Sequence, residues 1–178
     1  IYLDTDMLIL KSLNFLLQKN DCFFGAENLD SISAGVIGAK PKSIFIKHTL
    51  LFYDCLKFNF KNTKSHTIPI VLTKIFREEY NFNSRFQSIV EIDNIKIYPI
   101  DYFYPVDYHD RRDIRNYKNY ITENTYAVHL WNSSWIEQSE FDYIRQREYS
   151  KGFKKAFRNM KKRENINFKY LRKILSCI

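Results

Sequence analysis

Two carboxylates stand close together near the start of the chain, in Asp4-Thr5-Asp6. They follow the apolar residues Ile1 to Leu3, which predict a short strand that ends at Asp4. Side chains two residues apart on an extended chain point to the same side, so both carboxylates could face one cation. Hard divalent ions such as Mg²⁺ and Mn²⁺ prefer oxygen ligands of this kind. The pair therefore predicts a metal site, although two surface carboxylates at this spacing also arise by chance.

A second group of chemically capable side chains surrounds His129. Trp131 and Trp135 are the only tryptophans of the chain, and both lie within six residues of this histidine. An indole face stacks well on a base, a ribose or a sugar ring, and the hydroxyls of Ser133 and Ser134 can bond a phosphate or a sugar. Two interpretations stay open: a ligand-binding group, or a packed core histidine with core tryptophans and a plain turn.

The elements that position these side chains are predicted to alternate between strands and helices. After the first strand, a helix is predicted from the apolar residues Leu8, Leu13, Phe15, Leu16 and Leu17. Residues 21–43 hold three of the four glycines and indicate loops around a strand from Ile32 to Ile37. Later patterns predict helices over 43–60 and 68–80, one or two strands within 90–104, a loop over 106–124, a strand over 126–131 and helices after residue 135. This order is typical of an α/β fold.

Composition excludes several classes of protein. With 178 residues, 45% of them hydrophobic, the chain can form one domain with a sizeable core and does not resemble a disordered protein. Three widely spaced cysteines do not make a disulfide framework or a cysteine zinc site, which favours a reducing compartment. The longest apolar runs have about five residues, against the roughly 20 that a membrane span needs. Because the chain opens with Ile inside an apolar run, we expect an N-terminal part to be missing from it.

Positive charge is concentrated towards the C-terminus. Residues 145–173 hold 12 basic and two acidic residues, a net charge of +10 against +8 for the whole chain, which leaves −2 for the rest. An apolar line that begins just before this range, and is interleaved with Lys and Arg, consists of Phe141, Ile144, Phe153, Phe157 and Met160. This pattern is typical of a helix that lies on anionic lipid headgroups. The alternative is a helix that packs on the preceding domain and keeps its charges in solvent.

Several segments, in their order along the chain, resemble one known family. They are Tyr2-Leu3-Asp4-Thr5-Asp6-Met7, the glycine-bearing region Phe24 to Ala39, Ile70-Val71-Leu72-Thr73, Tyr98-Pro99 with Tyr102-Phe103-Tyr104-Pro105, and Tyr126 to Trp135. Together they resemble the DXD-containing sugar transferases of glycosyltransferase family 32. That family includes bacterial capsule and surface-polysaccharide transferases and yeast initiating mannosyltransferases. The resemblance covers about residues 1–136.

The resemblance implies a GT-A-type α/β fold for residues 1–136, without its first strands and helices. The charge and apolar pattern of the tail separately predicts a basic amphipathic helical region over residues 137–178. The resemblance also implies a metal-dependent glycosyltransferase that moves a sugar, with retention, from a UDP- or GDP-sugar to a saccharide or lipid-linked acceptor in capsule or surface-polysaccharide synthesis. The implied cofactor is Mn²⁺ or Mg²⁺, held by Asp4, Asp6 and His129. The implied nucleotide-sugar-binding residues are Asp4, Asp6, Ala34, Gly35, Ser133, Ser134 and Trp135.

Neither the residues nor the resemblance identifies a catalytic nucleophile. Glu27, Asp30 and Asp101 are candidates, and each also reads as an ordinary surface acid. We expect a cytoplasmic protein whose basic tail contacts the anionic inner face of the membrane, and we expect no nucleic-acid partner.

Two alternative functions remain open at this point. An apolar strand that ends in Asp-X-Asp also opens the site of haloacid-dehalogenase-type phosphatases, which would use Asp4 and Asp6. Such a site usually has Thr or Val two places after the second Asp, where this chain has Leu8, and it leaves the residues around His129 unexplained. The basic tail could instead belong to a non-enzymatic module that binds nucleic acid or a membrane.

Overall fold

The computed structural model describes residues 1–56, 65–132, 139–145, 147–162 and 168–177. The chain forms two compact units, Ile1–Trp131 and Asn132–Ile178, and each is described by itself. The predicted boundary after residue 136 falls in the segment 133–138, which lies outside the described residues.

The first unit is built on a five-stranded sheet with the order β1-β4-β3-β6-β5. Its strands are β1 (Tyr2–Leu3), β3 (Cys22–Ala26), β4 (Ile32–Ala39), β5 (Val90–Ile92) and β6 (Ile95–Tyr98). Only the β3–β6 pair is parallel among these strands; the others are antiparallel. Asp93 and Asn94 both have positive φ, as a tight turn between β5 and β6 requires, and their short polar side chains tolerate it. A separate two-stranded sheet pairs β2 (Met7–Ile9) with β7 (Ala127–His129).

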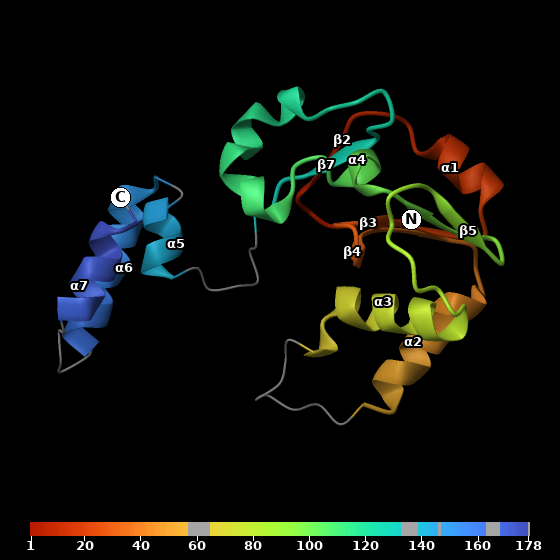
Figure 1. Cartoon of the computed structure of the whole chain (residues 1–178), viewed down its shortest axis with the longest axis horizontal. Helices are drawn as coiled ribbons and strands as arrows, with labels where there is room; N and C mark the ends of the chain where they lie inside the picture. Colours follow the sequence, from red (N-terminus) through yellow and green to blue (C-terminus); the bar gives the residue numbers. More distant parts are fainter. Residues whose placement is uncertain (57–64, 133–138, 146, 163–167, 178) are drawn as a thin grey trace. The chain divides into compact units, whose positions relative to one another are not determined.

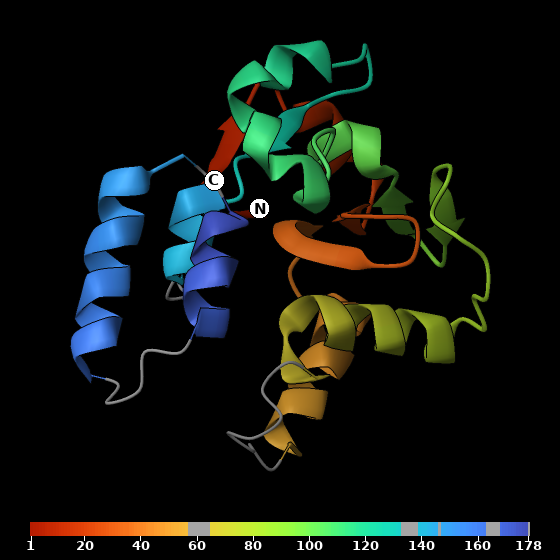
Figure 2. The ribbon, with the colours of Figure 1, turned by 60° about the vertical axis from the view of Figure 1, so that its left-hand side comes forward.

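Helices cover both sides of the large sheet, and the small sheet lies on one of these sides, as Figures 1 and 2 show. One side is covered by α2 (Ile44–Asp54) and α3 (Ile68–Glu79), and the other by α1 (Asn14–Lys19), α4 (Ile100–Phe103) and the β2–β7 pair. A 3₁₀-helical segment, η2 (Tyr108–Asn119), which is kinked at Asn116, leads from α4 towards β7. The central strand is therefore enclosed on both faces. Phe24 packs in the α2–α3 core, whereas its neighbour Phe23 packs in the α1–α4 core.

Several predicted elements are confirmed, with small shifts at their ends. The helix predicted over 68–80 is α3, which begins with Pro69 in its first turn, and the strand predicted over 126–131 is β7. The helix predicted over 43–60 is α2 as far as Asp54; residues 57–64 lie outside the described part. The strand predicted from Ile32 is β4, which extends to Ala39. The mixed α/β class is thereby confirmed.

Four local predictions were wrong. Leu8 lies in strand β2 and not in the helix that begins at Asn14. The loop predicted around residues 21–31 contains β3, whose residues are all buried, so the strand lacks the alternation that marks a half-exposed strand. The region 100–103 is a short helix, α4, and the predicted loop over 106–124 contains η2.

In its described residues the second unit forms the helices α5 (Glu140–Arg145), α6 (Tyr149–Lys162) and α7 (Phe168–Leu175). Ile144, Ala156 and Ile174 form its small apolar core. Glu140 is only 5% exposed, and its carboxylate accepts hydrogen bonds from Asn159 of α6 and Tyr170 of α7. One buried carboxylate thus ties the three helices together. None of the described helices is both long and apolar enough to cross a membrane.

Candidate functional site

The two N-terminal carboxylates lie where the chain passes from the large sheet to the small one. The Asp4 amide donates to the Gly35 carbonyl at 2.9 Å, which extends the β1–β4 pairing by one residue. The Met7 amide then donates to the Asp4 carbonyl at 3.1 Å and closes a turn. Asp4-Thr5-Asp6 is therefore a turn and not the extended strand that the spacing argument assumed. The carboxylates converge because the turn folds the chain back.

His129 is brought to the same place by the small sheet. Met7 pairs with His129 across the β2–β7 ladder, and the Leu130 amide donates to the Asp6 carbonyl at 2.9 Å. The His129 Nε2 atom lies 3.3 Å from Asp6 Oδ1 and 3.8 Å from Asp4 Oδ2. One ligand atom from each of the three residues falls within 4.8 Å of the others. Residues about 120 positions apart in the sequence thus form one cluster.

The chemistry of this cluster suits a divalent cation. Burial lowers the pKa of His129 below the usual 6.5, although the negative charges of Asp6 and Asp4 act in the opposite direction. The lowered pKa favours the neutral imidazole. A neutral imidazole can offer the lone pair of Nε2 to a metal. The side chains of Asp6 and His129 are 16% and 12% exposed, so water screens the charge of the Asp6 carboxylate poorly. Two carboxylates and one neutral imidazole form a donor set that fits Mn²⁺ and related ions.

Tyr104 and Trp131 enclose the imidazole. The sequence had indicated Trp131 as a possible stacking residue beside His129, but it had not assigned Tyr104 to the site. The Trp131 ring meets the His129 ring edge-on, with centroids 4.2 Å apart, and Trp131 Nε1 donates to the Val106 carbonyl at 2.8 Å. Trp131 has a φ of 54°, an unusual conformation for a bulky residue. Such backbone strain is often found at functional sites. The sequence signal for Trp131 was its position two residues after His129.

A break in the regular pairing of β4 brings Gly35 against the cluster. Phe24 pairs with Ile37 and Ala26 with Ile32, so one residue of β3 faces four of β4 between these pairs. Irregular pairing of this kind redirects side chains. A Cβ atom on Gly35 would lie 2.8 Å from Tyr104 Oη and 3.3 Å from Asp4 Oδ2. Gly35, one of the predicted nucleotide-sugar-binding residues, therefore lies at the cluster beside Asp4.

Substitution of Gly35 by Ala is expected to affect the cluster directly. The backbone of Gly35 does not need positive φ, so the effect comes from the added methyl group alone. Because Tyr104 is fully buried, its hydroxyl cannot move away freely. We expect a loss of about 1–3 kcal/mol in unfolding free energy and about tenfold weaker Mn²⁺ binding, measured by urea denaturation and metal titration.

A second substitution tests whether the Tyr104 hydroxyl causes this effect. That hydroxyl lies near Ser33 but makes no hydrogen bond of normal geometry with the described residues. Tyr104→Phe therefore removes the atom nearest to the new methyl group at little cost. Gly35→Ala combined with Tyr104→Phe should recover most of the lost stability. A double variant as unstable as Gly35→Ala alone would contradict this account of the packing.

The other residues predicted to bind the nucleotide-sugar differ in where they lie. Ala34 packs with the apolar cluster on the α2–α3 side of the sheet, so its side chain belongs to that core. Ser133, Ser134 and Trp135 lie outside the described residues, and their predicted roles stay predictions.

The three candidate nucleophiles occupy separate places. Burial raises the pKa of Glu27, and a hydrogen bond from the Ser33 hydroxyl opposes this rise. Asp30 is exposed, and its carboxylate lies 3.6 Å from Arg85 Nε in a surface ion pair. Asp101 accepts a hydrogen bond from Asn124 at 3.1 Å. None of the three belongs to the group formed by Asp4, Asp6 and His129.

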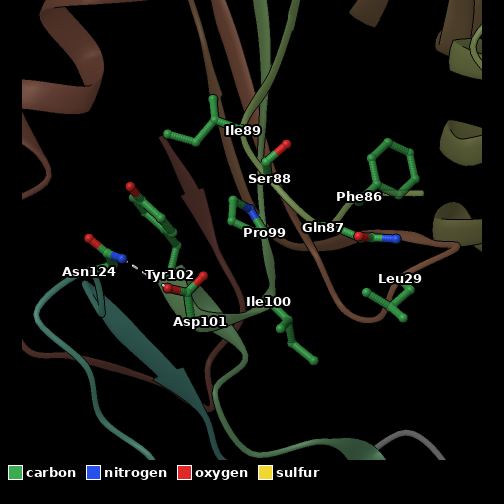
Figure 3. A pocket seen from close by; sticks show the side chains of 10 residues that line it. All are labelled: Leu29, Phe86, Gln87, Ser88, Ile89, Pro99, Ile100, Asp101, Tyr102 and Asn124. Carbon is green, nitrogen blue, oxygen red and sulfur yellow. Dashed lines mark hydrogen bonds between the residues drawn. The ribbon is translucent and has the colours of Figure 1, made fainter. Parts of the chain in front are cut away.

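An open pocket of about 670 Å³ lies beside α4. Figure 3 shows its lining, in which Asp101 and Asn124 bond each other and most of the other side chains are apolar. The pocket shares no residue with the carboxylate–histidine cluster. We place the chemistry at the cluster, because the ligand atoms of Asp4, Asp6 and His129 converge on one point, whereas the lining of the pocket is mostly apolar.

Residues 45–157 match the family described as the alpha 1,4-glycosyltransferase conserved region. This match spans more than half of the chain. The chain belongs to this family. The earlier resemblance to glycosyltransferase family 32 is thereby confirmed, and the protein is a glycosyltransferase. No curated protein and no solved structure matches the chain.

The matched region begins inside α2 and ends inside α6 of this glycosyltransferase. It contains His129, whereas Asp4 and Asp6 lie upstream of it. Family membership favours sugar transfer over the phosphatase and over the non-enzymatic module. The sheet topology also argues against the phosphatase. The strand before Asp4 pairs antiparallel with β4 at the sheet edge, whereas doubly wound phosphatase-like sheets are mainly parallel.

Proposed function

We propose that this glycosyltransferase is a metal-dependent enzyme of the GT-A type that takes a sugar from a UDP- or GDP-sugar. The observation that carries the proposal is the convergence of Asp4, Asp6 and His129, whose ligand atoms lie within 4.8 Å of one another. The cofactor is Mn²⁺ or Mg²⁺, since carboxylate oxygens dominate the donor set. Asp4 and Asp6 supply the negative charge that balances the ion, and His129 completes the set as a neutral ligand.

The chemistry required of such a site is the separation of charge during sugar transfer. When the bond between the sugar and the phosphate breaks, the sugar carbon becomes oxocarbenium-like and the nucleoside diphosphate gains negative charge. A divalent ion held by this cluster stabilises the diphosphate as a Lewis acid. The burial of Asp6 and His129 strengthens these electrostatic interactions by excluding water. Gly35, which has no side chain, leaves space beside Asp4.

The finer parts of the proposal follow from the family resemblance. Ser133, Ser134 and Trp135 close over the donor diphosphate, transfer proceeds with retention, and the acceptor is a saccharide or a lipid-linked saccharide. The enzyme works in the cytoplasm in capsule or surface-polysaccharide synthesis.

Calorimetric titration with nucleotides tests the proposal. UDP, GDP and their common sugar conjugates are titrated into the protein, once with Mn²⁺ and once with EDTA. We expect one of the two nucleotides to bind in the presence of the metal and to lose its binding in EDTA. Binding of either nucleotide that is equally tight in EDTA would contradict metal dependence. Absence of binding under both conditions, in a protein that is folded by circular dichroism, would contradict the assigned donor class.

A further inference from the structure

Helix α6 exposes a line of aromatic side chains. Tyr149, Phe153 and Phe157 follow one another at intervals of four residues, so they lie along one side of the helix. They are 39%, 46% and 59% exposed. The packed side of the helix is a different one, where Gly152 and Ala156 are buried. A Cβ atom on Gly152 would lie 2.5 Å from Ile144 Cγ1, which shows how closely α5 and α6 approach there.

The predicted apolar line of the tail is thus divided into two parts. Ile144 is fully buried and Phe141 packs beside it, so these two residues belong to the core of the second unit. Phe153 and Phe157 remain exposed. We call the exposed side chains of Tyr149, Phe153 and Phe157 the aromatic stripe.

Basic residues surround the aromatic stripe on the same helix. Lys151, Lys154 and Arg158 are exposed, and residues 145–173 carry a net charge of +10. Of the two acidic residues in that range, Glu148 pairs with Lys151 at 2.5 Å. The second unit therefore presents aromatic rings within a strongly positive surface.

We propose that the aromatic stripe inserts into the headgroup region of an anionic lipid bilayer, while the neighbouring basic residues bind the lipid phosphates. The amphipathic ring of Tyr149 favours the boundary between headgroups and acyl chains, and the apolar rings of Phe153 and Phe157 gain free energy by leaving water there. Lys and Arg add electrostatic attraction to anionic lipids. The exposed side chains of helix α7 favour a lipid surface, and not a nucleic acid, as the binding partner. It exposes Leu171 and Leu175, 40% and 69% respectively, beside Arg172 and Lys173. Leucine enters acyl chains readily but offers a base no ring on which to stack.

Vesicle flotation with the whole chain tests this surface. The protein is mixed with phosphatidylcholine vesicles, with and without phosphatidylglycerol, and the bound fraction is measured. We expect binding to the anionic vesicles only, and weaker binding as the salt concentration rises. The double variant Phe153→Ala/Phe157→Ala should bind at least about tenfold more weakly. Lys154→Gln/Arg158→Gln should also weaken binding to the anionic vesicles.

Phe15→Ala is the matched control, since Phe15 is a 55% exposed aromatic residue of the first unit. It should bind vesicles as the natural chain does.

Equal binding of the Phe153/Phe157 variant and the natural chain would overturn the proposal. A second result would also overturn the proposal: the natural chain binds no vesicles, and the Phe153/Phe157 variant loses much of its unfolding free energy. The aromatic stripe would then pack within the protein. Tighter binding to a single-stranded oligonucleotide than to anionic vesicles would overturn the proposal in favour of nucleic acid. These readouts do not involve the metal site, so this inference stands or falls separately from the proposed transferase mechanism.

Discussion

Replacement of Asp6 by Asn is expected to weaken Mn²⁺ binding by more than about 100-fold and to abolish metal-dependent donor binding. The amide removes one of the two negative charges that face His129 Nε2, which lies 3.3 Å from Asp6 Oδ1. Asp6 is the more buried of the two carboxylates, so water can replace its charge least well. His129→Ala should have a similar effect because it removes the only nitrogen ligand of the cluster. Titration calorimetry with Mn²⁺, followed by titration with the nucleotide, measures both steps.

The matched control for Asp6→Asn is Asp110→Asn, which makes the same change of charge at an exposed residue of η2. It should bind the metal and the donor normally. In EDTA, Asp6→Asn should be as stable as the natural chain, because the substitution keeps the shape of the side chain and relieves repulsion between two carboxylates. Full donor turnover by Asp6→Asn or by His129→Ala would refute the roles assigned to these residues.

Replacement of Phe76 by Ala is expected to give the largest loss of stability, about 3–5 kcal/mol in unfolding free energy. Phe76 is fully buried in the C-terminal half of α3. Its ring contacts several other aromatic rings: those of Phe45, Tyr80, Phe82 and Phe86. Removal of the ring leaves a cavity, and these contacts also link α3 to α2 and to the segment that follows α3. Denaturation by urea, followed by circular dichroism, measures the loss.

Ile70→Ala is the control on the same helix, since Ile70 is 48% exposed. It should change the unfolding free energy by no more than about 0.5 kcal/mol. If Phe76→Ala were no more destabilising than Ile70→Ala, the aromatic cluster would not be the core of the first unit.

Sequence patterns predicted elements best where one side of the element faces solvent. Helix α3 has a periodic apolar side and Pro69 in its first turn, and both features are local. Strand β3 lacks any such signal, because Phe23 and Phe24 are buried on opposite faces of the sheet. The short strand β2 exists because it pairs with β7, a partner far along the chain. A local window of residues contains no information about that partner.

The sequence by itself determined the residue types of the candidate site and the family. Asp4, Asp6 and His129 stood out by chemistry and by their order, and these signals require no coordinates. Only the tertiary structure decided how they meet, through a turn at Asp4 and the pairing of Met7 with His129. It also decided which aromatic residues of the tail are core and which are exposed. The physical reason is that long-range pairing and packing depend on segments distant in sequence, whereas residue chemistry and helical periodicity are properties of the local chain.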